Sequence, residues 1–187
     1  MAQFRDFGRE MSSRIFRDLS LQEDILITES SALPENLKYC CQIKSTGSSM
    51  ESHFLAFFSE DMANNLVKEA LPWEKNPSLK VALSIFEEYA NMMMASMQKA
   101  MSRVDFLSLT VPRVEILQNN TIPTPDLTQK LPDSPDTIMI NDSWFLKFKF
   151  GTLYNQLKTQ IKDADDFSEG NFDCDSEFIL GGQAIIF

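Results

Sequence analysis

PSLKVALSIFEEYANMMMASMQKAMS, residues 77–102, is the stretch that decides the fold. Pro77 suits the first turn of a helix, because its missing N–H needs no partner there, and no glycine or proline follows before Pro112. Residues that favour helices dominate the stretch. Apolar side chains recur every three or four positions, at Leu79, Ala82, Leu83, Phe86, Ala90, Met93, Met94, Met97 and Met101. This spacing predicts one long amphipathic helix with a broad buried stripe.

The opposite side of this helix carries a regular row of small and polar residues. Ser84, Glu88, Asn91 and Ala95 are four, three and four residues apart, so they stack along one helix face. Most exposed helix faces carry such residues only because they are solvated. Asn is unfavourable in the middle of a helix, however, which favours a task for the amide of Asn91.

Composition limits the functional classes that need to be considered. A chain of 187 residues with 43% hydrophobic residues suits one folded domain with a real core. The formal net charge of −10 argues against nucleic acid as a partner, because nothing in the sequence resembles a basic patch. Three cysteines and a single histidine, His53, offer little material for a disulfide framework or a metal site. We expect a cytoplasmic protein, since no signal peptide or apolar run of about 18 residues is visible.

The remaining elements follow from residue spacing and turn residues. Ser59 is expected to cap a short helix, and Thr46-Gly47-Ser48-Ser49 to join two antiparallel strands. A second strand pair is expected to turn at Asn141-Asp142. The spacing predicts helices over 3–19, 60–71 and 154–162, and strands over 24–28, 39–44, 50–58, 106–117, 136–140 and 144–150. Together these elements predict an α/β layered domain, an α+β sandwich whose largely antiparallel sheet has long helices packed on one face.

Two regions fall outside this regular pattern. Residues 119–135 hold four prolines and are expected to form a loop. After an acidic stretch at 163–175, the chain closes on the apolar run FILGGQAIIF, residues 178–187. We therefore divide the chain into a domain over 1–155 and a C-terminal extension over 156–187. The extension is expected to pack on the same domain or on a dimer partner, because an exposed apolar edge invites pairing.

Three consecutive pieces now resemble a known family. They are HFLAFFSEDMANNLVKEAL at 53–71, the spacing Ser84-x-x-x-Glu88-x-x-Asn91 on the long helix, and LSLTVPRV at 107–114. This arrangement resembles the CheX-type domain of the CheC/CheX/FliY class of chemotaxis phosphatases over roughly residues 40–150. The chain has one copy of the motif, as CheX-like members do. Ala95 and Ser96 stand where the family commonly has Gly and Asn.

The resemblance implies a phosphatase that hydrolyses the aspartyl phosphate of a CheY-like response regulator. It implies that Asn91 orients the attacking water and that Glu88 pairs with a lysine of the receiver, while Ser84 and Ala95 belong to the partner-binding face. The magnesium ion would be on the receiver, and the phosphatase would need no cofactor of its own. A homodimer formed through the sheet stays open.

Three other interpretations remain. A domain with Ala95 in place of Gly could bind a receiver without turning it over. A purely structural oligomerisation domain would instead bury Ser84, Glu88 and Asn91 or pair them with one another. A small-molecule pocket lined by residues 92–97 is the third, although a Met stripe at helical spacing more often packs a core.

Overall fold

The described part of the protein forms one antiparallel sheet with helices packed on one face. The computed structural model describes residues 2–29, 34, 36–73, 78–101, 105–118 and 137–162. Within these residues the helices are α1 (Ala2–Ser20), α2 (Glu60–Ala70) and α3 (Leu79–Met101). The strands are β1 (Leu26–Thr28), β2 (Tyr39–Thr46), β3 (Met50–Phe58), β4 (Ser108–Leu109), β5 (Arg113–Ile116), β6 (Ile138–Phe148) and β7 (Gly151–Ile161). The predicted α+β class is confirmed.

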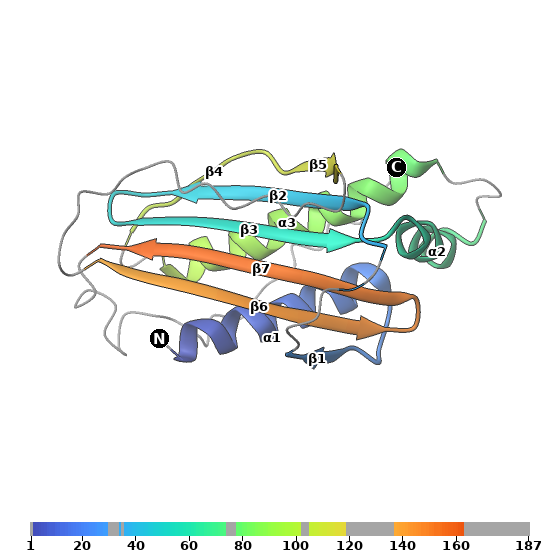
Figure 1. Ribbon diagram of the computed structural model, residues 1–187, viewed down its shortest axis with the longest axis horizontal. Helices are drawn as coiled ribbons and strands as arrows, with labels where there is room; N and C mark the ends of the chain where they lie inside the picture. The colour runs from blue at the N-terminus through green and yellow to red at the C-terminus, as the bar shows by residue number, and fades with distance from the viewer. Residues whose placement is uncertain are drawn as a thin grey trace.

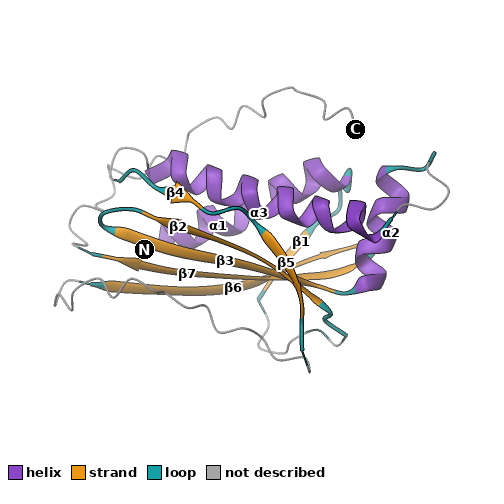
Figure 2. Ribbon diagram, turned by 90° about the horizontal axis from the view of Figure 1, so that it is seen from above, coloured by secondary structure: helices purple, strands orange, loops and turns teal. Residues whose placement is uncertain are grey.

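The sheet has seven strands in the order β1-β6-β7-β3-β2-β4, and β5 also pairs with β2. Every pairing is antiparallel. Figures 1 and 2 show α1 and α3 side by side across one face, with α2 at the end of the sheet where β3 ends. The other face, called the outer face below, carries none of these three helices.

The long helix forms as its spacing predicted. It begins after Ser78, whose hydroxyl accepts a hydrogen bond from the backbone N–H of Val81 at 3.4 Å. Phe86, Met93 and Met97 are buried against the sheet with most of the predicted stripe, whereas Leu79 is 37% exposed. Phe86 stacks on Phe58 of β3, with 3.6 Å between the ring centroids. Burial of this stripe holds α3 on the sheet.

Two further local predictions are confirmed. The β2–β3 hairpin pairs Tyr39 with Phe58 and Thr46 with Glu51, so its turn spans the predicted Gly47 region. Helix α2 begins where expected, because the hydroxyl of Ser59 accepts a hydrogen bond from the N–H of Met62 at 3.2 Å. Pro112 interrupts the segment after α3, which forms two short edge strands, β4 and β5, on either side of it.

The turn predicted at Asn141-Asp142 is wrong. Strand β6 runs through both residues, and the chain turns after Phe148 to pair β6 with β7. Asn-Asp is a frequent turn signal, but here strand alternation places Asn141 on the outer face, where it is exposed. Asp142 faces the helices and is neutralised there by Arg9 of α1. A tertiary ion pair thus overrides the local turn preference.

The helix predicted over 154–162 is also wrong, because these residues belong to strand β7. Leu153, Leu157 and Ile161 are four residues apart, which fits one helix face. The same spacing also fits one face of a strand, since four is a multiple of two. All three are buried toward the helices.

Strand β7 also crosses the division placed between residues 155 and 156, so residues 156–161 belong to the central sheet. Residues 163–187 lie outside the described residues, as do Pro77, Ser102 and the proline-containing stretch 119–136. The fate of the C-terminal extension therefore stays a prediction.

A smaller apolar cluster covers one end of the outer face. It consists of Leu37, Cys40, Leu55, Phe57, Phe145 and Tyr154. Cys40 and Cys41 are free and buried, on opposite faces of β2. Burial raises the pKa of Cys40 to about 12, so this thiol stays protonated and packs as a small apolar side chain.

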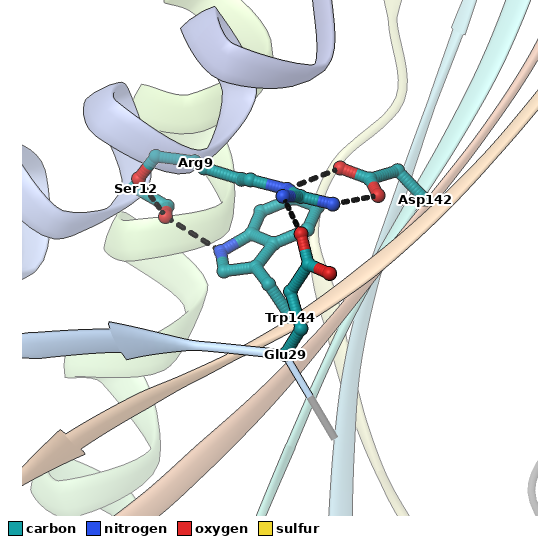
Figure 3. A network of polar contacts seen from close by, with 5 residues as sticks. All are labelled: Arg9, Ser12, Glu29, Asp142 and Trp144. Atoms are coloured by element: carbon teal, nitrogen blue, oxygen red, sulfur yellow. Dashed lines mark hydrogen bonds and ion pairs between the residues drawn. The ribbon is translucent and has the colours of Figure 1, made fainter. Parts of the chain in front are cut away.

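A polar network joins α1 to the sheet beside the main core (Figure 3). Arg9 donates two hydrogen bonds to Asp142, from Nε to Oδ2 at 2.9 Å and from Nη2 to Oδ1 at 2.7 Å. Arg9 also pairs with Glu29, and the indole N–H of Trp144 donates to the hydroxyl of Ser12 at 2.7 Å. The side chain of Asp142 is only 6% exposed, so removal of either partner leaves a charge poorly solvated.

Asp142→Ala is therefore expected to lower the free energy of unfolding by about 2–3 kcal/mol, because the guanidinium of Arg9 loses its bidentate hydrogen-bond partner. Urea denaturation followed by circular dichroism measures the change. Glu29→Ala is the matched control: this carboxylate is 70% exposed and should contribute less than about 0.5 kcal/mol. Equal losses in free energy of unfolding in the two variants would contradict the larger contribution that we assign to the Arg9–Asp142 pair.

Candidate functional site

The candidate site is the outward face of α3. Asn91 is exposed, whereas Ser84, Glu88 and Ala95 are partly exposed, so the structure brings all four predicted residues to one accessible helix face. Among the residues that the structure describes, no hydrogen bond or ion pair engages the side chain of Glu88 or Asn91. A carboxylate and a carboxamide are thus displayed one turn apart with their hydrogen-bonding capacity unused inside the fold.

Ser84 differs from these two residues. Its hydroxyl donates a hydrogen bond to the backbone carbonyl of Val81, one turn earlier, at 2.8 Å. The hydroxyl can still accept a hydrogen bond, but its proton is committed to the helix. This geometry suits a supporting position beside Glu88. It also argues against the interpretation in which Ser84, Glu88 and Asn91 satisfy one another.

The direction of this face is set by the buried residues between its members. Tyr89 and Ala90 separate Glu88 from Asn91, and both are fully buried. The hydroxyl of Tyr89 donates to the carboxamide oxygen of Asn155 in β7 at 3.0 Å. Burial raises the pKa of Tyr89 well above its ordinary value, and hydrogen bonds to Ser12 and Asn155 only partly offset this. Tyr89 thus fixes the rotation of α3 with a polar contact in addition to packing.

The C-terminal end of α3 is held by a carboxylate clamp. Asp105 follows the helix and accepts five hydrogen bonds from the β2–β3 turn. They come from the N–H and hydroxyl of Ser48, at 3.1 and 2.9 Å, the N–H and hydroxyl of Ser49, at 2.9 and 3.2 Å, and the N–H of Met50, at 3.1 Å. Gly47 completes the clamp, because a Cβ there would overlap the carboxylate.

The clamp stabilises the charged form of Asp105. Burial opposes ionisation and is the largest single influence, but the hydrogen bonds from Ser49 and Ser48 together outweigh it. The pKa of Asp105 consequently lies below its ordinary value. Sequence analysis missed both Tyr89 and Asp105, because Tyr89 resembles any buried aromatic residue and Asp105 lies 55 residues or more from its partners.

The structure places the other candidate side chains away from this face. His53 lies in β3, where its Nε2 is 3.2 Å from the carboxamide oxygen of Gln42, as expected for a strand residue. Met93, Met94 and Met97 belong to the main core, which argues against a ligand pocket there. In the described part of the chain, no three His, Cys, Asp or Glu side chains are grouped to hold a metal ion. Nor is any described helix both long and apolar enough to span a membrane.

Comparison with known proteins identifies the fold through solved structures. No protein-family model and no curated protein matches the sequence. Among solved structures, the chemotaxis protein CheX from Vibrio vulnificus has a TM-score of 0.64 at 11% identity, covering 83% of this chain and 95% of that one. A CheC-like superfamily protein from Shewanella sp. PV-4 has a TM-score of 0.59 at 15% identity, covering 85% and 98%.

A third similar structure is a CheX-CheY complex with BeF3 and magnesium from Borrelia burgdorferi. It has a TM-score of 0.59 at 12% identity and covers 84% of this chain and 96% of that one. Together these likenesses confirm the predicted resemblance at the level of fold: the chain has the fold of the CheX- and CheC-like chemotaxis proteins.

Asp105→Asn should lower the free energy of unfolding by about 2 kcal/mol at neutral pH, because the amide puts a donor against backbone N–H groups. The pKa of Asp105 is lower in the folded than in the unfolded protein. Its stabilisation is therefore complete above the unfolded value of about 4 and is lost as pH falls through the folded value. Urea unfolding is measured between about pH 3 and 7. The difference in free energy of unfolding between wild type and variant should be constant above about pH 4 and should decrease at lower pH.

The exposed carboxylate of Asp24 provides the control for this experiment, since Asp24→Asn removes the same charge without a buried acceptor. The clamp would be refuted as a source of pH-dependent stability by either of two results. One is a loss in free energy of unfolding for Asp105→Asn that is the same at every pH, and the other is the same pH dependence in Asp24→Asn.

Proposed function

We propose that the protein is an aspartyl-phosphate phosphatase that acts on a CheY-like response regulator. One observation carries the proposal: Glu88 and Asn91 share the outward face of a rigid helix, and among the described residues neither side chain has a partner. The CheX/CheC-like fold and the motif spacing support the proposal. The Borrelia burgdorferi structure supports the class of partner, since that protein is a CheX in complex with CheY.

In the proposed mechanism α3 docks on the receiver with its outward face. Asn91 enters the receiver's phosphorylated pocket, and its amide holds a water in line with the phosphorus atom. An amide suits this role because it donates and accepts hydrogen bonds, carries no charge and does not compete for the metal ion. Hydrolysis of an acyl phosphate needs positioning more than covalent chemistry from the enzyme.

Glu88 would form an ion pair with a receiver lysine close to the phosphate. This pair would orient the docked helix, because Glu88 lies one turn from Asn91 and both can reach the same small site. Magnesium would be supplied by the receiver. We place this reaction in the cytoplasm, in keeping with the expectation from the sequence.

Ala95 provides a specific reason to keep a second candidate. It lies on the docking face one turn beyond Asn91, where its methyl group stands in place of the glycine common in the family. The methyl group limits how closely a partner backbone approaches. A domain that binds a phosphorylated receiver one to one without turning it over is therefore the alternative.

Asn91→Ala and Glu88→Ala are each expected to reduce accelerated dephosphorylation to the receiver's own rate. The first variant loses the amide that holds the water, and the second loses the ion pair that orients the docked helix. Both positions are accessible, so the free energy of unfolding should change by no more than about 0.5 kcal/mol. The measurement is loss of phosphate from the host's phosphorylated receiver domains with sub-stoichiometric protein. Asn65→Ala, an exposed asparagine on α2, is the matched control.

The outcomes separate the two candidates. Many turnovers per molecule that depend on Asn91 and Glu88 support catalysis, whereas saturation at one receiver per molecule supports binding alone. Undiminished turnover by either variant would eliminate the proposed mechanism.

A further inference from the structure

A hollow of about 430 Å³ lies on the outer face of the sheet, remote from the outward face of α3. It is lined by Gln42, Ile43, Lys44, His53, Thr110, Val111 and Arg113. These residues come from β2, β3 and the edge segment that forms β4 and β5 (Figure 1). The volume falls within the range of small-molecule sites, which is roughly 300–1,000 Å³.

The hollow exists because the edge of the sheet bulges. Gln42 pairs with Arg113 and Ser45 pairs with Leu109, so two residues of β2 face the three residues 110–112. Pro112 has no N–H to offer the ladder. Thr110 closes one side, since its hydroxyl accepts from the N–H of Lys44 at 3.0 Å and its own N–H donates to the carbonyl of Lys44 at 2.9 Å. The bulge is thus anchored rather than frayed.

The side chains around the hollow are rich in hydrogen-bond donors and positive charge. Strand alternation directs Gln42 and Lys44 to the outer face, because Ile43 between them packs toward the helices. His53 is 3% exposed and lies opposite Lys44, which places it at the floor. Its contact with the oxygen of Gln42 leaves the NH2 of that amide available as a donor. Arg113, at the rim, is exposed.

The local charge contrasts with that of the whole chain. Lys158 faces the outer side beside His53, and the residues that line the hollow include no carboxylate. Glu51 and Glu115 lie on the same face, each two residues along the strand from a lining residue. Two basic side chains from separate strands, Lys44 and Arg113, therefore line one hollow of a protein whose net charge is −10. An acidic protein has no need of such a cluster for solubility.

We propose that this hollow is a binding site for a small organic phosphate. A phosphate monoester directs oxygens toward several sides at once, so Arg113 and Lys44 can bind it from neighbouring strands. The amide of Gln42 adds a neutral donor, and Val111 offers an apolar surface to the organic part. The hollow also has room for more than a few waters, since a water occupies only about 30 Å³, so an organic group can lie beside the phosphate.

Partners already present within the protein do not conflict with this assignment. Lys44, Glu51 and His53 each take part in at least one further interaction. A lysine or histidine in such a contact exchanges its partner for the phosphate, which lowers the affinity without changing the class of ligand.

The test is a titration of the full chain, labelled with 15N, at about pH 7.5, where a phosphate monoester is mostly dianionic. Glycerol phosphate, inorganic phosphate and succinate are compared at constant ionic strength set with sodium chloride. We expect glycerol phosphate to give saturable shifts in the amide signals of residues 42–44 and 110–113, and to bind more tightly than the other two. Shifts that sodium chloride reproduces would overturn the proposal, as would tighter binding of succinate.

Arg113→Gln should weaken the binding of glycerol phosphate about tenfold, the effect of removing a charge-assisted hydrogen bond. Lys147→Gln, which removes one positive charge from the outer side of β6 away from the hollow, should leave the affinity unchanged. Equal losses in the two variants would show a general charge effect and refute a site. Because neither residue lies on α3, this result stands apart from any result on receiver dephosphorylation.

Discussion

The structure depends on the burial of one side of α3 against the sheet. Ten residues of this helix are buried, and they recur at helical spacing. Rotation of the helix by one residue would expose part of the Met and Phe stripe and bury Glu88 or Asn91 without a partner, and both changes cost free energy. The Tyr89–Asn155 hydrogen bond adds a directional requirement to this packing. The outward position of Glu88 and Asn91 is therefore a consequence of the core.

Polar contacts fix the position of the helices along the sheet, which apolar packing alone does not determine. Arg9 and Asp142 fix α1 on β6, and Asp105 fixes the end of α3 on the β2–β3 turn. Apolar surfaces can slide with little change in buried area, whereas a carboxylate with five donors has one good position. Both contacts join segments that are far apart in the sequence, and the Arg9–Asp142 pair also links the first helix of the described chain to a strand near its end.

Features were predictable from the sequence when they depend on residues close together in the chain, and were not predictable when they depend on residues far apart in the chain. The stripe of α3, the Ser59 cap and the β2–β3 turn depend on neighbours within a few residues, and all were predictable. The face that carries Ser84, Glu88, Asn91 and Ala95 was predictable because helix geometry alone relates these residues. Strand β6 was misjudged at Asn141-Asp142, because only Arg9, 133 residues away, makes a strand acceptable there. Strand β7 was predicted as a helix because the four-residue spacing of its apolar side chains fits one face of a helix as well as one face of a strand.

Glu88 and Asn91 remain unexplained by stability. Among the described residues they make no hydrogen bond or ion pair, and Asn is less favourable than Ala in a helix interior by roughly 0.5 kcal/mol. Their neighbours in the chain, Tyr89 and Ala90, are held in the core, so the support beneath them is rigid. A rigid support matters little to a solvated residue, but it is essential for a group that must hold a water in line with a reacting atom. The reason for this pair of side chains is therefore to be sought in a molecule that binds the face from outside.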